Sequence, residues 1–408
     1  MKQIQLIITA KSPLAIGYKK PGSVSEAADF ISGSVIRGAI AAYLLRSSPN
    51  QEQPEPGDDF SLLFVDENAA IFQNAYPTNN NAEVKVLPST VVSAKAKPGF
   101  KPKGYGVFDT LIDRLCAEKL GYLYDPNCPT ALEKGDDGRV EPFSGFYIQS
   151  GKSYKTQSVS KRLLTRVGIN RRRATSEEQI LYSLEVLNES KKTDDRLEPV
   201  TYRSAILLDD EGLANHLTQF INTRGDRIHL GGSTSRGLGR VEMTAKCGNY
   251  QSQLKERIDN FNKLLHQRWG IWSNLYRESS NDIKNLTFFT IDLQSDAILS
   301  DRWKRTTVIS PQMLKEFAGI DDPTLELEAA YSSYDTNSGW NSAWRLMKDI
   351  ELTTTRGTVY LFSSKEIERW YEPLKKLECS GIGDRTLEGF GQVEICNEFH
   401  TIFREKVV

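Results

Sequence analysis

The stretch HLGGSTSRGLGRVEM, residues 229–243, decides how the rest of the chain is interpreted. It combines four glycines, two arginines and three hydroxyl side chains, and it runs directly into an alternating, strand-like segment. Its second half, GLGRVEM at 237–243, recurs as GFGQVEI at 389–395, an offset of 152 residues. A weaker match pairs LIITAKS at 6–12 with FTIDLQS at 289–295, an offset of 283 residues. The sequence therefore predicts an internal duplication whose first copy carries a long insertion.

Each copy has the same expected order of elements: strand, helix, two strands, helix, glycine loop and strand. KDIELTTTRGTVYLF at 348–362 alternates like a hairpin around an Arg-Gly turn, and apolar spacing predicts helices at 109–120 and 254–269. Because this order is that of ferredoxin-like (RRM-like) folds, we expect an α+β chain with two such domains in tandem. The expected parts are a first domain (1–50 and 141–250), an insertion (51–140), a helical connector (251–285) and a second domain (286–408).

The composition is that of a globular protein with more than one domain. Hydrophobic residues make up 39% and charged residues 26% of 408 positions, and no window predicts a membrane helix. The five cysteines are odd in number and scattered, which favours reduced thiols and a cytoplasmic location. Cys128 begins like half of a zinc knuckle, but Ala131 stands where the second cysteine would be, so we predict no metal site.

Charge is distributed unevenly although its formal sum is only −1. The 35 positions from 142 to 176 contain no acidic residue and eight basic ones, and the window 84–108 contains five lysines and no acid. Such segments are typical either of a solvated surface or of a surface that contacts phosphates. The presence of two such windows weakens the case for a merely solvated surface and keeps a phosphate-bearing partner open.

The spacing in the glycine loop excludes the common nucleotide motifs, because neither the Walker pattern nor the dinucleotide fingerprint is present and no helix follows. A glycine loop before a strand lets another backbone approach closely, and free amides in it form a nest for phosphate oxygens. A tight structural turn is the alternative for each loop. The candidate RNA-binding residues in the first loop are Gly231, Gly232, Ser233, Ser235, Arg236, Gly237, Gly239 and Arg240.

Together with the glycine loop, ISGSVIRGAI at 31–40 and VGINRRRATSEEQILYSLEVL at 167–187 resemble the RAMP superfamily of CRISPR-associated proteins. In that superfamily a Gly-Ser motif with a following basic residue opens the first helix, an Ile-Asn-Arg segment lies mid-domain, and a glycine-rich loop precedes the last strand. Here Ser32 stands at the usual proline. FQNAYP, LPSTVVSAKAKPGF and GVFDTLIDRL in the insertion are similar to the Csx-ten family of type III-D systems, although only Cys128 remains of the Cys-x-x-Cys usual there.

The resemblance implies an RNA-binding subunit of a type III CRISPR effector complex that holds the guide crRNA by its backbone and caps its repeat-derived 5′ tag. Its partners would be crRNA, target RNA indirectly, further RAMP proteins and the large polymerase-like subunit, without a membrane. Base pairing by the guide, not the protein, would read the target. The residues implied, with the nearby basic ones, are Lys19, Lys20, Ser34, Arg37, Arg162, Arg166, Asn170, Arg171, Arg172 and Arg173. Phe146, Tyr147 and Tyr154 are candidates either for base stacking or for the core.

Two enzymatic alternatives stay open. A target-cleaving ribonuclease would use an aspartate before the first helix, for which Asp29 is the candidate beside Glu26, and a divalent metal would be needed only in a catalytic case. A guide-processing endoribonuclease would use a histidine, and His216 and His229 are the candidates near the glycine loop; for His216 we expect a structural role. A stand-alone mRNA-binding protein is a third class, but it would not explain the insertion or the duplicated loops.

Overall fold

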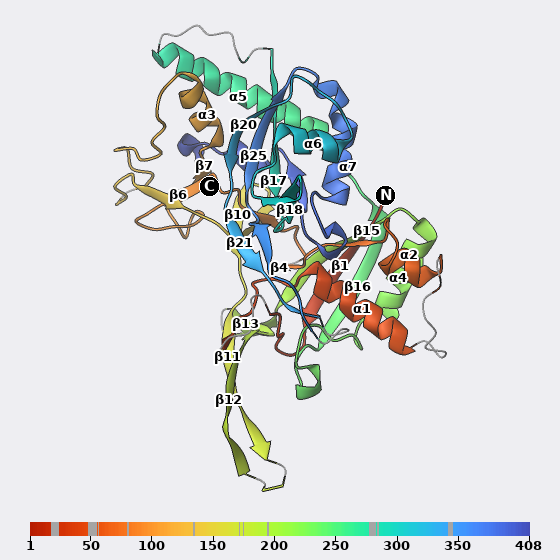
Figure 1. The fold of residues 1–408 in the computed structure, drawn as a ribbon. Coiled ribbons are helices and arrows are strands. Elements are labelled where there is room, and N and C mark those ends of the chain that lie inside the picture. Colours follow the sequence, from red (N-terminus) through yellow and green to blue (C-terminus); the bar gives the residue numbers. More distant parts are fainter. Residues whose placement is uncertain are drawn as a thin grey trace.

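The computed structural model describes residues 1–17, 24–47, 55, 57–79, 81–133, 135–170, 172–173, 175–193, 196–276, 283, 285–341 and 346–408. Two antiparallel sheets, each with helices packed on it, form the body of the molecule (Figure 1). We call them the first and second units. A mixed α and β architecture is thereby confirmed.

The first sheet is built around β1, whose alternation buries Ile4, Leu6 and Ile8 completely. β1 lies between the last strand, β16, and the third, β15, and both pairings are antiparallel. The strands are β1 (Lys2–Ala10), β3 (Ile71–Phe72), β4 (Tyr76–Thr78), β15 (Thr201–Leu208) and β16 (Val241–Asn249). The helices are α1 (Gly33–Ser47), α2 (Asp59–Phe64) and α4 (Glu211–Arg224).

The second sheet repeats this order, because β17 likewise lies between the last strand, β26, and the third, β25. Its strands are β17 (Thr287–Leu293), β20 (Glu326–Tyr331), β25 (Val359–Ser364) and β26 (Val393–Ile395). The helices are α5 (Leu254–Tyr276), α6 (Pro311–Ala318) and α7 (Tyr371–Ser380). The helix expected at 254–269 is confirmed as the longer α5, and its apolar stripe packs into the core of the second unit.

The hairpin expected at 348–362 is wrong in its pairing. Two strands do flank the Arg356-Gly357 turn, but β24 (Glu351–Thr354) pairs with β21 (Tyr334–Asn337), whereas β25 pairs with β17 and β20. Since β25 is paired along both edges, it has no free edge for β24.

The segment 51–140 is shared between the units. β3 and β4 join the first sheet, while α3 (Leu111–Lys119), which confirms the helix expected at 109–120, packs into the core of the second. Smaller sheets connect the two. Their strands are β5 (Lys85–Val86), β9 (Phe146–Ser150) and β10 (Ser153–Gln157), then β6 (Val91–Ala94), β7 (Val107–Asp109) and β8 (Val140–Pro142).

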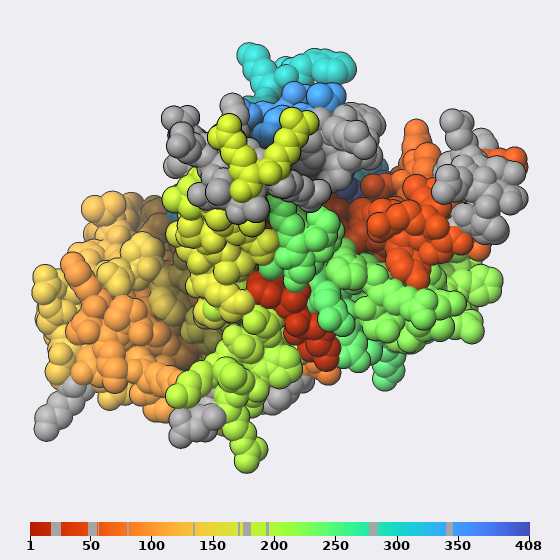
Figure 2. Space-filling view, turned by 90° about the horizontal axis from the view of Figure 1, so that it is seen from below, coloured from red at the N-terminus to blue at the C-terminus, as the bar shows by residue number. Residues whose placement is uncertain are grey.

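A long hairpin, which we call the arm, stands out from the body (Figures 1 and 2). It consists of β11 (Lys161–Asn170) and β12 (Thr175–Leu187), and β2 (Val24–Ser25) pairs with its root. The remaining strands are β13 (Ser190–Thr193), β14 (Arg196–Pro199), β18 (Leu299–Asp301), β19 (Lys304–Thr306), β22 (Trp340–Asn341) and β23 (Leu346–Met347). Within the described residues, no helix has the length and apolar character needed to cross a membrane.

Candidate nucleic-acid interface

The two glycine loops have the same backbone geometry at the offset read from the sequence. Ser233 and Arg385 are both left-handed, with φ of 57° and 58°, and each precedes a short 3-10 turn closed by a left-handed glycine. The amide of Gly232 donates to Ala15 O, and the amide of Asp384 donates to Ile298 O, both at 2.9 Å. These pairs have the offsets of 152 and 283 residues read from the sequence, so the two loops make matching backbone contacts.

The first loop is a tight turn whose amides are mostly used inside the protein. Besides Gly232, the amides of Arg236, Gly237 and Gly239 donate to backbone carbonyls, and that of Arg240 donates to the Ser12 hydroxyl. A nest of free amides for phosphate is therefore contradicted at these positions. The side chains of the loop are what remains for a ligand, and Ser235, Arg236 and Arg240 are exposed.

The root of the arm brings a second set of candidates to this loop. Both terminal nitrogens of Arg166 on β11 lie 3.4 and 3.5 Å from Arg236 O. Arg236 in turn donates to the Tyr182 hydroxyl on β12, and its guanidinium lies 5.6 Å from the centre of that ring. Apolar side chains of both strands pack with Leu238 beneath this contact. Figure 2 shows the arm in yellow beside the green segment that carries the loop.

We call Arg166, Arg236 and Arg240 the basic strip. In the described part of the chain, none of them has an acidic partner, whereas Arg162 pairs with Glu189 at 3.1 Å. In the other acid-free window, two of the five lysines have acidic partners, since Lys85 pairs with Glu394 and Lys101 with Glu133. Tyr182, which the sequence did not single out, positions Arg236 of the basic strip through a hydrogen bond and its ring.

The remaining basic candidates lie at the tip of the arm or outside the described residues. Asn170 ends β11, and Arg172 and Arg173 are exposed in the turn that follows. Lys19, Lys20 and Arg171 lie outside the described residues. The tip projects away from the body in Figure 1, and Arg166 of the basic strip lies midway along β11, four residues before Asn170.

Ser34 and Arg37 lie at the start of α1, which is covered by the second glycine loop. A Cβ on Gly33 would lie 2.7 Å from Glu388 O, and Gly33 N donates to the Asn74 side chain at 2.8 Å. Arg37 is half-buried, donates to Phe64 O, and has a pKa lowered by burial. As RNA contacts, both residues stay predictions, and in the structure Arg37 is bound within the protein.

Asp29 is exposed at the junction of the arm and the second unit. Lys161 Nζ lies 2.7 Å from its carboxylate, and Arg356 Nη2 lies 3.9 Å away. Arg356 also lies over the rings of Phe30 and Phe146. Asp29 is thus held between two cations, an arrangement that neutralises the carboxylate beside the root of the arm.

The histidine and aromatic candidates have different surroundings. His216 is 73% exposed, and its Nδ1 lies 4.0 Å from the Asp59 carboxylate, so it is not a buried core residue. His229 is also exposed and pairs in an isolated bridge with Arg240. Phe146 and Tyr147 are buried, which confirms that they belong to the core.

Cys128 belongs to a loop that a guanidinium holds together. Arg404 donates to the carbonyls of Pro126, Thr130 and Gly138, at 3.1, 2.9 and 3.3 Å. Hydrogen bonds from Thr130, with Arg404 nearby, lower the pKa of the Cys128 thiol. Arg404 thus ties three points of this loop together. Among the described residues, no group of three metal-ligating side chains is found.

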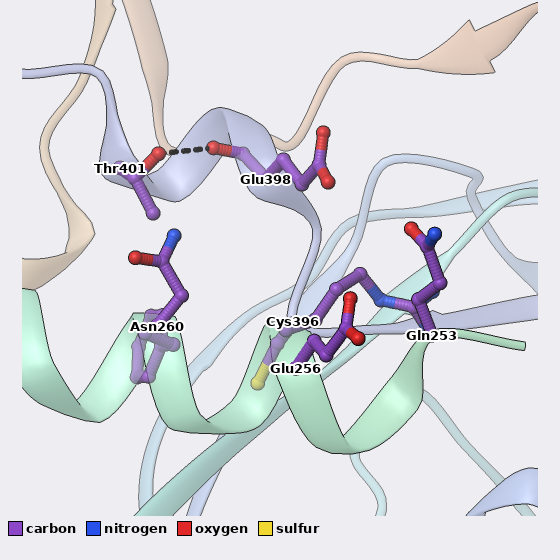
Figure 3. A pocket seen from close by; sticks show the side chains of 8 residues that line it. Gln253, Glu256, Asn260, Cys396, Glu398 and Thr401 are labelled. Carbon is purple, nitrogen blue, oxygen red and sulfur yellow. Dashed lines mark hydrogen bonds between the residues drawn. The ribbon is translucent and has the colours of Figure 1, made fainter.

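A polar cavity of about 190 Å³ lies away from the arm, between α5 and the C-terminal segment (Figure 3). Glu256 and Glu398 line it, and Cys396 lies at its wall, where burial raises the pKa of the thiol to about 12. Arg257 also lines it, but its guanidinium is paired with Glu378, so the two carboxylates disfavour an RNA backbone in this cavity.

No curated protein matches the chain. A chain of the cryo-EM structure of the type III-B Cmr-beta bound to cognate target RNA and AMPPnP shares 12% identity at a TM-score of 0.40, with 90% of this chain and 88% of that chain covered. A chain of the type III-B Cmr-beta bound to cognate target RNA shares 13% identity at a TM-score of 0.38. The match covers 88% of this chain and 86% of that chain. The model of the RAMP superfamily matches residues 7–242, from β1 through the glycine loop into β16. Because that match spans more than half of the sequence, the chain belongs to the RAMP superfamily.

Proposed function

We propose that this protein is an RNA-binding subunit of a type III CRISPR effector complex and holds the guide crRNA by its backbone, including the repeat-derived 5′ tag. The observation that carries the proposal is the basic strip, in which two separate segments of the chain present arginines without acidic partners among the described residues. Arginine forks bind phosphate oxygens in this way and carry no sequence information. Membership of the RAMP superfamily supports the same function.

The proposal extends to fold, partners and location. The strand order of each sheet supports tandem ferredoxin-like units with the domain boundaries expected from the sequence, although 51–140 contributes to both units. Further RAMP proteins, the large polymerase-like subunit and, through the guide, target RNA are the partners. The five free cysteines agree with a cytoplasmic location.

RNA co-purification tests the function. The chain is expressed with its genomic neighbours, and the RNA bound to it is sequenced. We expect a discrete short RNA with a constant 5′ end, and we expect the Arg166→Ala/Arg236→Ala variant to lose it. Lys375→Ala/Lys376→Ala, which removes two exposed charges from α7, is the matched control. Heterogeneous or absent RNA on the wild-type chain would refute the proposal.

Asp29 favours a second candidate function, cleavage of target RNA, because an exposed carboxylate lies beside the arm. Its pairing with Lys161 favours a structural role instead. Target cleavage by the complex with Asp29→Asn distinguishes the two. Unchanged cleavage products support the scaffold function, and loss of one product assigns the cut to this chain.

A further inference from the structure

The β18–β19 hairpin presents a tryptophan completely to solvent. Trp303 has a relative exposed area of 102%, the largest value among the exposed hydrophobic residues of the described chain. It lies in the two-residue turn between the paired residues Asp301 and Lys304. Figure 2 shows the chain near residue 300, in cyan, standing out from the rim of the face that carries the arm.

The backbone of this turn is unfavourable for the residues in it. Arg302 and Trp303 have φ of +45° and +71°. Two-residue hairpin turns with positive φ at both positions prefer Asn-Gly, because a bulky side chain is strained there. A strained turn that carries an unpacked aromatic ring does not serve stability, so it points to a ligand.

The hairpin is nevertheless held firmly. Leu299 is fully buried, and Arg305 donates to Asp384 at 2.6 Å and to Glu351 at 2.7 Å. These ion pairs fix the hairpin to the second glycine loop and to β24. The ring is therefore displayed on a rigid base, and little conformational freedom would be lost when it binds.

The charges around the ring select the kind of ligand. Arg302 and Lys304 flank Trp303 and are exposed, and neither has an ion pair with any residue that the structure describes. A flat aromatic ring between two cations is complementary to a nucleobase with its phosphates. An apolar pocket on a partner protein could bind Trp303, but the charges of Arg302 and Lys304 would add no affinity to that contact.

The sequence repeat relates this turn to a pair of lysines in the first copy. At the offset of 283 residues that relates Ala15 to Ile298, Arg302 and Trp303 correspond to Lys19 and Lys20 in the sequence. The same loop of the first copy is a candidate for RNA contact from its charge alone. The second copy thus keeps one cation and replaces the other by an aromatic ring.

We propose that Trp303 stacks on an unpaired nucleobase of RNA while Arg302 and Lys304 contact the adjacent phosphates. This inference rests on the proposed RNA-binding function and adds a second contact point outside the basic strip. Unpaired bases offer both faces of the ring system, whereas a duplex hides them, so the site discriminates single strands from duplexes.

The test measures binding of a labelled single-stranded RNA and of the same sequence as a blunt duplex to the full chain by fluorescence anisotropy. Trp303→Ala is expected to weaken single-strand binding by roughly five- to one-hundred-fold and to leave duplex binding unchanged. Trp303→Phe, which keeps an aromatic ring, should restore most of the affinity. Trp303→Gly suits the positive φ and ensures a folded variant, and Leu123→Ala removes an equally exposed apolar side chain as a control.

Photocrosslinking gives a direct readout. RNA substituted with 5-iodouridine should crosslink to the peptide that contains Trp303, and the crosslink should disappear in Trp303→Gly. If the wild type binds no RNA, both this inference and the proposed function fail. If Arg166→Ala/Arg236→Ala weakens binding but Trp303→Ala does not, only this inference fails. If Trp303→Ala instead releases another subunit while RNA binding stays intact, the β18–β19 turn binds a protein partner and the inference is overturned.

Discussion

Gly239 and Gly391 occupy the same place in the two units. A Cβ on Gly239 would lie 2.4 Å from Leu230 O, and one on Gly391 would lie 1.9 Å from Ile382 O, in both cases nine residues earlier in the chain. Both residues also have positive φ. Each loop thus needs glycine at this position because its own backbone passes over it.

Alanine substitutions distinguish the destabilisation caused by the close carbonyl from that caused by the positive φ alone. Gly239→Ala should lower the free energy of unfolding by on the order of 3 kcal/mol, since both φ and the close carbonyl oppose it. Gly237 has a similar φ of +84° but no atom within 4 Å of an added Cβ. Gly237→Ala should therefore lower it by only about 1–2 kcal/mol. Urea unfolding measures both values, and equal losses would show that the carbonyl contact is unimportant.

Salt dependence tests whether Arg236 contacts phosphate. Arg236→Ala should weaken binding to all RNA sequences alike and reduce the slope of log K against log salt by about 0.7–1. Titrations at several salt concentrations with two unrelated RNAs provide the measurement. Lys375→Ala should leave the slope unchanged, and a sequence-dependent loss for Arg236→Ala would contradict a backbone contact.

His400 makes the stability of the second unit depend on pH. The imidazole is fully buried between Asp292, at 2.8 Å from Nε2, and Asp109, at 3.1 Å from Nδ1. Although burial alone lowers its pKa, the two carboxylates raise the pKa from the ordinary 6.5 to about 10. Its contribution is fully present below pH 6.5 and is lost as pH rises towards 10.

The free energy of unfolding should thus fall by about 1.4 kcal/mol per pH unit between about pH 7 and 9 because of this group. His400→Gln should be less stable at about pH 7, since two buried carboxylates lose their cation. It should also show a flatter pH profile over the same interval. Denaturant unfolding at each pH provides the measurement, and parallel profiles for the two proteins would contradict a charged His400.

Arg404 should control the order of the loop around Cys128. Arg404→Ala removes three hydrogen bonds to carbonyls, so the amide of Cys128, which donates to Gly138 O at 3.2 Å, should exchange with deuterium faster. Arg404→Lys should show an intermediate rate because lysine lacks the planar fork. Arg139→Ala in the same loop, whose partner Asp137 is exposed, is the control. Equal exchange rates in all variants would refute the role of Arg404.

Local patterns predicted the repeated parts of the fold well. The glycine loops, β16, α3 and α5 follow from residue spacing within short windows, and both repeat offsets are visible in the amino-acid sequence alone. Pairing between distant strands is not visible in the sequence. β24 and β25 flank a turn but do not pair with each other, because a turn does not reveal which strand edges are already occupied. The basic residues of the arm and the loop were predicted separately. Their meeting through Tyr182 depends on tertiary packing, as do the roles of Arg404 and His400.

The contact between the second glycine loop and α1 is heterologous in the sense used for oligomer symmetry. It joins the loop of one unit to the helix of the other, and in the described chain the first loop makes no comparable contact with α6. In a two-fold arrangement each glycine loop would contact the helix of the other unit. In this head-to-tail arrangement only the second loop does so, and among the described residues the first loop and the start of α6 make no such contact with each other. The two units therefore meet head to tail through one loop and one helix, and not across a two-fold axis.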